Sequence, residues 1–169
     1  MHMPNLMRQS QHHEISETHN SEIPMAIEIT NKSGELVPTE QVRSLMQSSL
    51  AQLNLNLKCE LNIVFVDENE MTELHIKWME EPGPTDVLSF PMDLPENIGD
   101  AVTLGDIVIA PSVAAKQAEV AGHSLSDEIY ILAAHGLLHI LGHDHANAQD
   151  EKVMFAAQAD LIRNWSISA

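Results

Sequence analysis

Alternating apolar and polar positions predict four β-strands in this chain. In the second of them, Leu61, Ile63 and Phe65 occupy every other position, a period of two that is typical of a strand with one buried face. A loop rich in proline, asparagine and glycine separates the last two. The predicted strands are residues 26–30, 59–66, 86–90 and 106–110.

Between and after these strands, apolar residues recur every three or four positions, which predicts helices with one buried face. The first helix carries Val42, Leu45 and Leu50 on one stripe, with Thr39 as its predicted N-cap. The other four begin near residues 67, 111, 127 and 149. This order of elements predicts a single α+β domain, with a sheet of about four strands covered by about five helices.

The first 24 residues follow neither spacing and are rich in Gln, Ser, His, Asn and Glu. This composition predicts a disordered N-terminal tail, residues 1–24, followed by one folded domain, residues 25–169. There is no apolar run of about 20 residues that could span a bilayer, and no secretory signal is recognised. Cys59 is the only cysteine, so we expect a cytoplasmic protein with no intrachain disulfide and no membrane contact.

Three histidines at the end of the fourth predicted helix have the spacing of a metal site. His135 and His139 are four residues apart, so their side chains lie within about 40° of each other around the helix. Gly142 allows the chain to reverse, which brings His145 toward them. Three imidazoles with one open position are typical of catalytic zinc. We therefore predict one metal ion bound by His135, His139 and His145, zinc before other transition metals.

Three nearby residues are weaker candidates. His143 is four residues after His139, but Gly142 interrupts the helix between them, which favours a surface or supporting role. Asp144 could support a ligand or bond to the helix end. His123, in a loop after a glycine, is interpreted as a solvated side chain.

The spacing His-x-x-x-His-x-x-Gly-x-x-His also occurs in metzincin peptidases. Those enzymes carry a glutamate directly after the first histidine as the general base. In this chain that position is Gly136, which has no side chain to act as a base. A zinc metallopeptidase is therefore only a weak alternative function.

The segment His135–His145 resembles the metal motif of the YbeY family of endoribonucleases. Residues 84–91, Pro-Thr-Asp-Val-Leu-Ser-Phe-Pro, and 104–109, Leu-Gly-Asp-Ile-Val-Ile, resemble two further signatures in the family's order. The resemblance extends from about Met25 to the last helix. It implies a single-strand-specific endoribonuclease that matures the small-subunit ribosomal RNA 3′ end and serves ribosome quality control. It also implies the ribosome, or a small-subunit ribosomal protein, as the partner.

Two positions depart from the family pattern. Met79 stands where many members have an arginine, which could bind a phosphate as methionine cannot. His143 stands where many have tyrosine. Beyond residue 24 the chain has 22 acidic and 7 basic residues, a net charge of −15 that repels a polyphosphate. A non-enzymatic alternative therefore stays open, a metal-stabilised ribosome-assembly module that binds RNA beside a ribosomal protein.

The chemistry implied is metal-assisted hydrolysis of a phosphodiester. The general base cannot be assigned from the sequence, because Asp86 and Ser89 have structural roles as plausible as catalytic ones. Trp78, Phe90 and Met92 are of a type that can stack on RNA bases, and core packing is the default interpretation of each.

Overall fold

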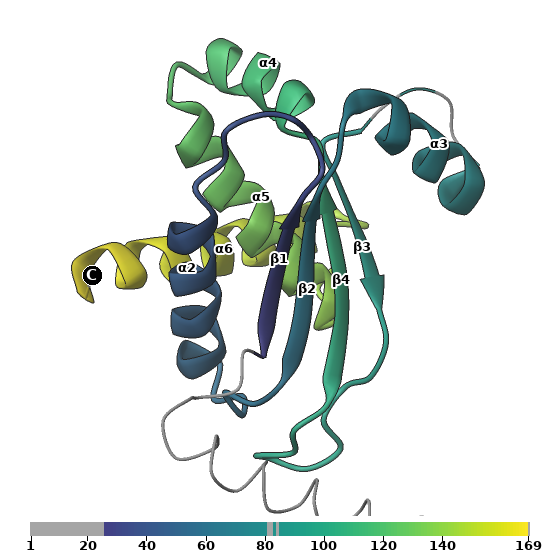
Figure 1. The fold of residues 1–169 in the computed structure, drawn as a ribbon. Coiled ribbons are helices and arrows are strands. Elements are labelled where there is room, and N and C mark those ends of the chain that lie inside the picture. Colours follow the sequence, from purple (N-terminus) through teal and green to yellow (C-terminus); the bar gives the residue numbers. More distant parts are fainter. Residues whose placement is uncertain (1–25, 81–82, 84, 169) are drawn as a thin grey trace, which may run out of the picture.

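The four strands form one mixed sheet in the computed structural model, which describes residues 26–80, 83 and 85–168. They are β1 (Ile27–Asn31), β2 (Glu60–Phe65), β3 (Val87–Pro91) and β4 (Thr103–Ile109). The order across the sheet is β1-β2-β4-β3 (Figure 1). β1, β2 and β4 are parallel, whereas β3 runs antiparallel to β4 and forms an edge. The predicted tail, residues 1–24, lies outside the described residues.

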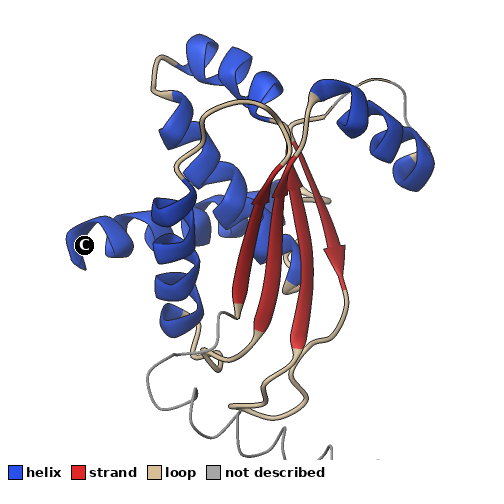
Figure 2. Cartoon of the chain, in the orientation of Figure 1, coloured by secondary structure: helices blue, strands red, loops and turns tan. Residues whose placement is uncertain are grey.

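Five helices are described, and they pack on both sides of the sheet (Figure 2). α5 packs against β3 and β4, α2 packs against β1, and α6 contacts both α2 and α5. α3 belongs to the opposite face and covers only one end of it (Figure 1). The helices are α2 (Thr39–Gln52), α3 (Glu68–Met79), α4 (Pro111–Ala121), α5 (Leu125–Ile140) and α6 (Ala148–Ser168). The predicted α+β fold and element order are therefore confirmed.

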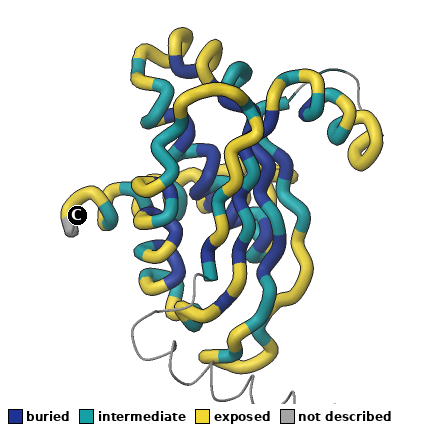
Figure 3. The backbone as a smooth tube through the Cα atoms, viewed as in Figure 1, coloured by how far each residue is buried: buried dark blue, intermediate teal, exposed yellow. Residues whose placement is uncertain are grey.

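The alternation along β2 divides the core into two layers. Leu61, Ile63 and Phe65 have no exposed surface and pack with α2 and α5 in the main cluster. Val64 points to the other face, where it packs in a smaller cluster that includes Met71 of α3. Figure 3 shows the buried residues concentrated on the strands and on the helix faces turned toward them. The sheet therefore has one fully covered face and one partly covered face.

Side-chain caps define two of the helix starts. Asp67 and Ser124 each accept a hydrogen bond from a backbone N–H in the first turn of α3 and α5, at 2.8 and 3.1 Å. Ser124 and Asp67 are thus the N-caps of these helices. The prediction of Thr39 as the N-cap of α2 was wrong. Thr39 is the first helical residue, and Pro38 is the N-cap and makes no side-chain hydrogen bond to the helix. None of the described helices is long and apolar enough to cross a membrane.

Gly105 allows β3 and β4 to approach each other closely. Its φ is +143°, and a Cβ atom there would lie 2.2 Å from the carbonyl oxygen of Phe90. A side chain would therefore push the edge strand away from β4. The Leu-Gly-Asp segment thus has a structural role in holding β3 in place.

Candidate metal centre

The last turns of α5 carry two of the three histidines, and a Schellman motif ends the helix just after them. Gly142 has a φ of +99°, and its N–H donates to the carbonyl of His139 at 3.0 Å. The N–H of His143 donates to the carbonyl of Leu138, also at 3.0 Å. This left-handed glycine reverses the chain, as expected for such a motif. The loop that follows brings His145 back to the face of α5 that carries the other two rings.

The rings of His135, His139 and His145 form one compact cluster. One ring nitrogen from each lies within 4.8 Å of the others. The ring centroids are 4.9 Å apart for the helical pair, and 5.1 and 5.8 Å from His139 and His135 to His145. For comparison with this limit of 4.8 Å, nitrogens bound tetrahedrally to one zinc ion lie about 3.3 Å apart. In the described part of the chain, no other set of three His, Cys, Asp or Glu residues forms such a group.

Burial keeps the two helical imidazoles in the form that binds metals. Burial lowers the pKa of His135 below its usual value, the hydrogen bond to Gln158 opposes this, and the neighbouring His145 lowers the pKa further. The pKa of His139 is lowered first by burial and then by the two adjacent imidazoles. Both rings are therefore neutral at pH 7, with a nitrogen lone pair available for a cation. The cluster fits an ion that prefers imidazole nitrogen.

Gln158 on α6 orients the first histidine, a contact that no sequence motif indicates. Its Oε1 lies 3.0 Å from Nδ1 of His135. Because an amide oxygen only accepts hydrogen bonds, Nδ1 carries the proton and Nε2 keeps its lone pair. A second contact, from the His139 ring to the backbone of His143, supports the neighbouring ligand. Such outer contacts fix the tautomer and the ring orientation of metal-binding histidines.

Loss of the Gln158 contact should weaken metal binding. We expect Gln158→Leu to lower zinc affinity by about tenfold to a hundredfold, because His135 would lose its tautomer constraint. Gln158→Glu keeps an acceptor at the same place and should bind at least as tightly as the wild type. Competition with a chromophoric chelator measures the affinity. Gln117→Leu, an exposed glutamine on α4, is the control, and equal affinity in all four proteins would contradict the assigned role.

The three rings open into a hollow of about 260 Å³ between the end of α5, the end of α3 and the edge strand β3. We call this hollow the metal groove. Met79 lies in its wall, so the position noted above as a departure from the family pattern faces the site. The lining residues are Met79, Thr85, Asp86, Val87, Leu88, Ser89, His135, His139 and His145.

Asp86 and Ser89 both have structural partners in this wall. Oδ1 of Asp86 accepts a hydrogen bond from the N–H of Val87 at 2.8 Å, at the start of β3. Oγ of Ser89 donates to the carbonyl of Gly136 at 3.1 Å and joins β3 to α5. The Asp86 bond orders the start of β3, and the Ser89 bond holds the edge strand against the histidine helix.

Gly136 is buried where α5 meets the sheet. A Cβ atom there would lie 2.8 Å from Cγ2 of Ile107 and 3.2 Å from Oγ of Ser89. A side chain at this position would enter the packed interface between helix and sheet. A glutamate base of the peptidase type has no room here, which argues against the metallopeptidase alternative.

The weaker candidates lie outside the three-ring cluster. His143 and Asp144 line a separate hollow with Asp150, and Oδ1 of Asp144 accepts a hydrogen bond from the N–H of His145 at 2.7 Å. Asp144 therefore orders the loop that carries the third histidine. The interpretation of His123 as solvated was wrong, because its Nε2 lies 2.6 Å from Oε1 of the buried Glu128.

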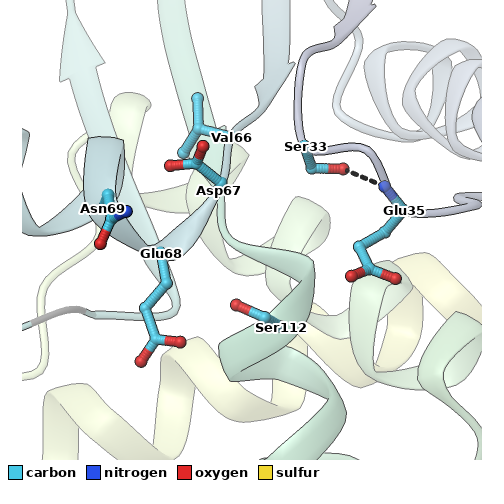
Figure 4. A pocket seen from close by; sticks show the side chains of 7 residues that line it. All are labelled: Ser33, Glu35, Val66, Asp67, Glu68, Asn69 and Ser112. Carbon is cyan, nitrogen blue, oxygen red and sulfur yellow. Dashed lines mark hydrogen bonds between the residues drawn. The ribbon is translucent and has the colours of Figure 1, made fainter.

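A second hollow of about 340 Å³ lies at the carboxyl ends of β1, β2 and β4. Figure 4 shows its lining, which contains carboxylates and hydroxyls but no histidine. Asp67 caps α3, and Glu68 lies 3.6 Å from the amino group of Lys116. These carboxylates have structural partners, so the metal chemistry is assigned to the histidine cluster. The lining residues are Ser33, Glu35, Val66, Asp67, Glu68, Asn69 and Ser112.

The fold and the site together place this protein in a class of single-domain α+β proteins. In this class, a helix end and the loop after it present three imidazoles that can hold one metal ion. The family model described as Endoribonuclease YbeY matches residues 27–166. This chain belongs to the YbeY family.

Curated relatives agree with this assignment over most of the chain. Endoribonuclease YbeY of Mycobacterium sp. (strain KMS) is 48% identical over 148 residues, which cover 83% of this chain and 84% of the relative. The protein of the same name from Thermobifida fusca is 46% identical over 146 residues, covering 83% and 94%. That from Clavibacter michiganensis subsp. michiganensis is 48% identical over 149 residues, covering 85% and 97%.

The fold also resembles a solved structure. The solution structure of TM1509 from Thermotoga maritima superposes with a TM-score of 0.57, covering 82% of this chain and 88% of that chain. The sequence identity is 24%, so this likeness supports the fold alone.

Proposed function

We propose that this protein is a zinc-dependent endoribonuclease that cuts single-stranded ribosomal RNA. It would act in maturation of the small-subunit RNA 3′ end and in ribosome quality control. The observation that carries the proposal is the compact cluster of three imidazoles, open to a groove, in a chain of the YbeY family. His135, His139 and His145 are the proposed ligands. The lone cysteine is buried and unpaired, which suits the cytoplasm, where we place this activity.

The groove and its histidines have separate parts in the proposed reaction. A bound zinc ion would polarise a phosphoryl oxygen and make a water molecule more acidic. His135 and His139, kept neutral by burial, hold the ion without competition from protons near pH 7. Gln158 fixes the donor nitrogen of His135. β3 forms the wall along which a strand of RNA would lie.

The charge of the domain favours a partner. With a net charge of −15 beyond residue 24, the domain repels RNA, and the groove itself contains no lysine or arginine among its described lining residues. We therefore propose that the ribosome or a small-subunit ribosomal protein supplies much of the affinity. The same observation favours the second candidate function, a metal-stabilised assembly module without catalysis.

A cleavage assay separates these two functions. A labelled single-stranded RNA is incubated with wild type and with His135→Ala, each with and without ribosomes. We expect weak, zinc-dependent cleavage by the isolated wild type, strong stimulation by ribosomes, and no cleavage by the variant. If His135→Ala cleaves the RNA as well as the wild type, the proposal of a metal-dependent hydrolase is refuted. Ribosome binding by the wild type without cleavage would leave the assembly module.

Met79→Arg should raise intrinsic cleavage. The side chain of Met79 lines the histidine groove, so an arginine there can reach a phosphate beside the metal. A hydrogen bond to a charged group contributes about 1.5–3 kcal/mol, which corresponds to roughly tenfold or more in kcat/KM. Val120→Arg adds the same charge at an exposed position of α4, away from the three clustered histidines, and is the matched control. If both variants gain equally, the effect is one of net charge and the local phosphate contact is refuted.

A further inference from the structure

Trp78 is the unexpected feature beside the groove. Its side chain is 58% exposed on the last turn of α3, although burial is the ordinary state of so large an apolar surface. α3 covers only one end of its face of the sheet (Figure 1), and none of the residues that the structure describes buries the indole. An exposed indole costs the protein solvation free energy that a ligand could recover.

The indole is held in place although it is exposed. Its edge meets the ring of Phe90 on β3, with centroids 6.0 Å apart and planes at 74°. The amino group of Lys77 lies over the indole ring, 5.3 Å from its centroid, so a base would stack on the opposite face. Lys77 adds a positive charge beside a ring in a strongly acidic domain. An ordered aromatic ring beside a cation is the arrangement that binds single-stranded nucleic acids, through base stacking and contact with the adjacent phosphate.

This surface adjoins the metal groove. Met79, the next residue along α3, lines the groove, and so does Ser89, the neighbour of Phe90 on β3. Another exposed aromatic ring, Phe155 on α6, lies 6.4 Å from the ring of His135 and is 48% exposed. An extended strand bound at the proposed metal would therefore have two exposed aromatic rings near its path.

We propose that Trp78 is a base-stacking subsite for the single-stranded RNA substrate, next to the cleavage groove. This inference rests on the proposed function and names its substrate subsite. Stacking on an aromatic ring is largely independent of net charge, so it supplies affinity that this acidic surface cannot gain from phosphates. It also requires an unpaired base, since a base within a duplex is already stacked on both faces. Trp78 is therefore a residue that selects single strands.

Fluorescence tests the subsite without any cleavage. The chain has two tryptophans, and Trp165 packs against Tyr130 with its indole N–H donating to Ser44. Trp165→Phe leaves Trp78 as the sole indole. A short 2′-O-methyl single-stranded oligonucleotide, which resists cleavage, should quench its emission. The same oligonucleotide in a duplex, or an abasic oligomer of equal length, should not. Equal quenching by the abasic oligomer would overturn the proposal.

Affinity provides the second readout. We expect Trp78→Ala to weaken binding of the single strand by about tenfold, and Trp78→Phe to restore most of the loss. Ile76→Ala, an exposed apolar residue on the same helix, should change affinity by less than about twofold. Affinity unchanged in Trp78→Ala would overturn the subsite. In cleavage assays Trp78→Ala should raise KM more than it lowers kcat.

The stacking subsite and the nuclease function can each be refuted without refuting the other. Quenching and stacking-dependent affinity without any cleavage would retain the subsite and remove the nuclease function. Cleavage by the wild type with no quenching, and with normal KM in Trp78→Ala, would remove the subsite and retain the nuclease.

Discussion

His139→Ala is expected to abolish stoichiometric zinc binding. The ring of His139 is close to both other rings, with centroid distances of 4.9 Å to His135 and 5.1 Å to His145. The variant would leave two imidazoles, one of them the exposed His145, and two ligands hold a dication poorly at a site that normally needs three. Elemental analysis of purified wild type and variant measures the effect, with about one equivalent expected in the wild type and far less than one in the variant.

His143→Ala is the matched control, because it removes a neighbouring imidazole that belongs to another hollow. We expect it to retain its full zinc content. A full equivalent of zinc in His139→Ala would refute the ligand set. Loss of zinc in His143→Ala would instead place this ring in the coordination sphere.

Gly136→Glu is expected to destabilise the fold severely and to create no peptidase. Overpacking a core typically costs about 1–3 kcal/mol, and a buried carboxylate without a partner adds several more. The first atom of the new side chain would already clash with Ile107. We therefore expect the free energy of unfolding to fall by more than about 3 kcal/mol in urea denaturation, or the protein to fail to fold.

Ala159→Glu introduces the same side chain at an exposed position of α6 and should change the free energy of unfolding by less than about 0.5 kcal/mol. A Gly136→Glu protein as stable as this control would mean that position 136 does not face the sheet. Casein hydrolysis by the folded variant would reopen the metallopeptidase alternative.

Local spacing predicted most of the fold and the composition of the histidine cluster. His135 and His139 are fixed relative to each other by one helix turn, and Gly142 indicates the reversal that brings in His145. Gln158 could not be found in this way. Its contact with His135 depends on how α6 crosses α5, a tertiary packing that no local spacing records. His123 was misjudged for the same reason, since its partner Glu128 is buried only by the folded structure.

Trp78 shows a second limit of sequence-based prediction, which concerns burial rather than tertiary contacts. On a helical stripe, the indole follows the spacing of a core residue, and core packing was its default interpretation. In the structure the side chain is exposed, and its ring meets Phe90 at the edge strand β3. Whether an apolar stripe is buried depends on the size of the surface opposite, which the stripe itself does not specify.

The path of the chain through the metal centre has a thermodynamic consequence. His135 and His139 belong to α5, His145 belongs to the loop after it, and Gln158 belongs to α6. An ion held by these histidines would close the loop between His139 and His145 as a cross-link does. Binding to the folded chain alone shifts the unfolding equilibrium by mass action, with about 2.7 kcal/mol gained at a hundredfold excess over Kd. The melting temperature would then report zinc loading.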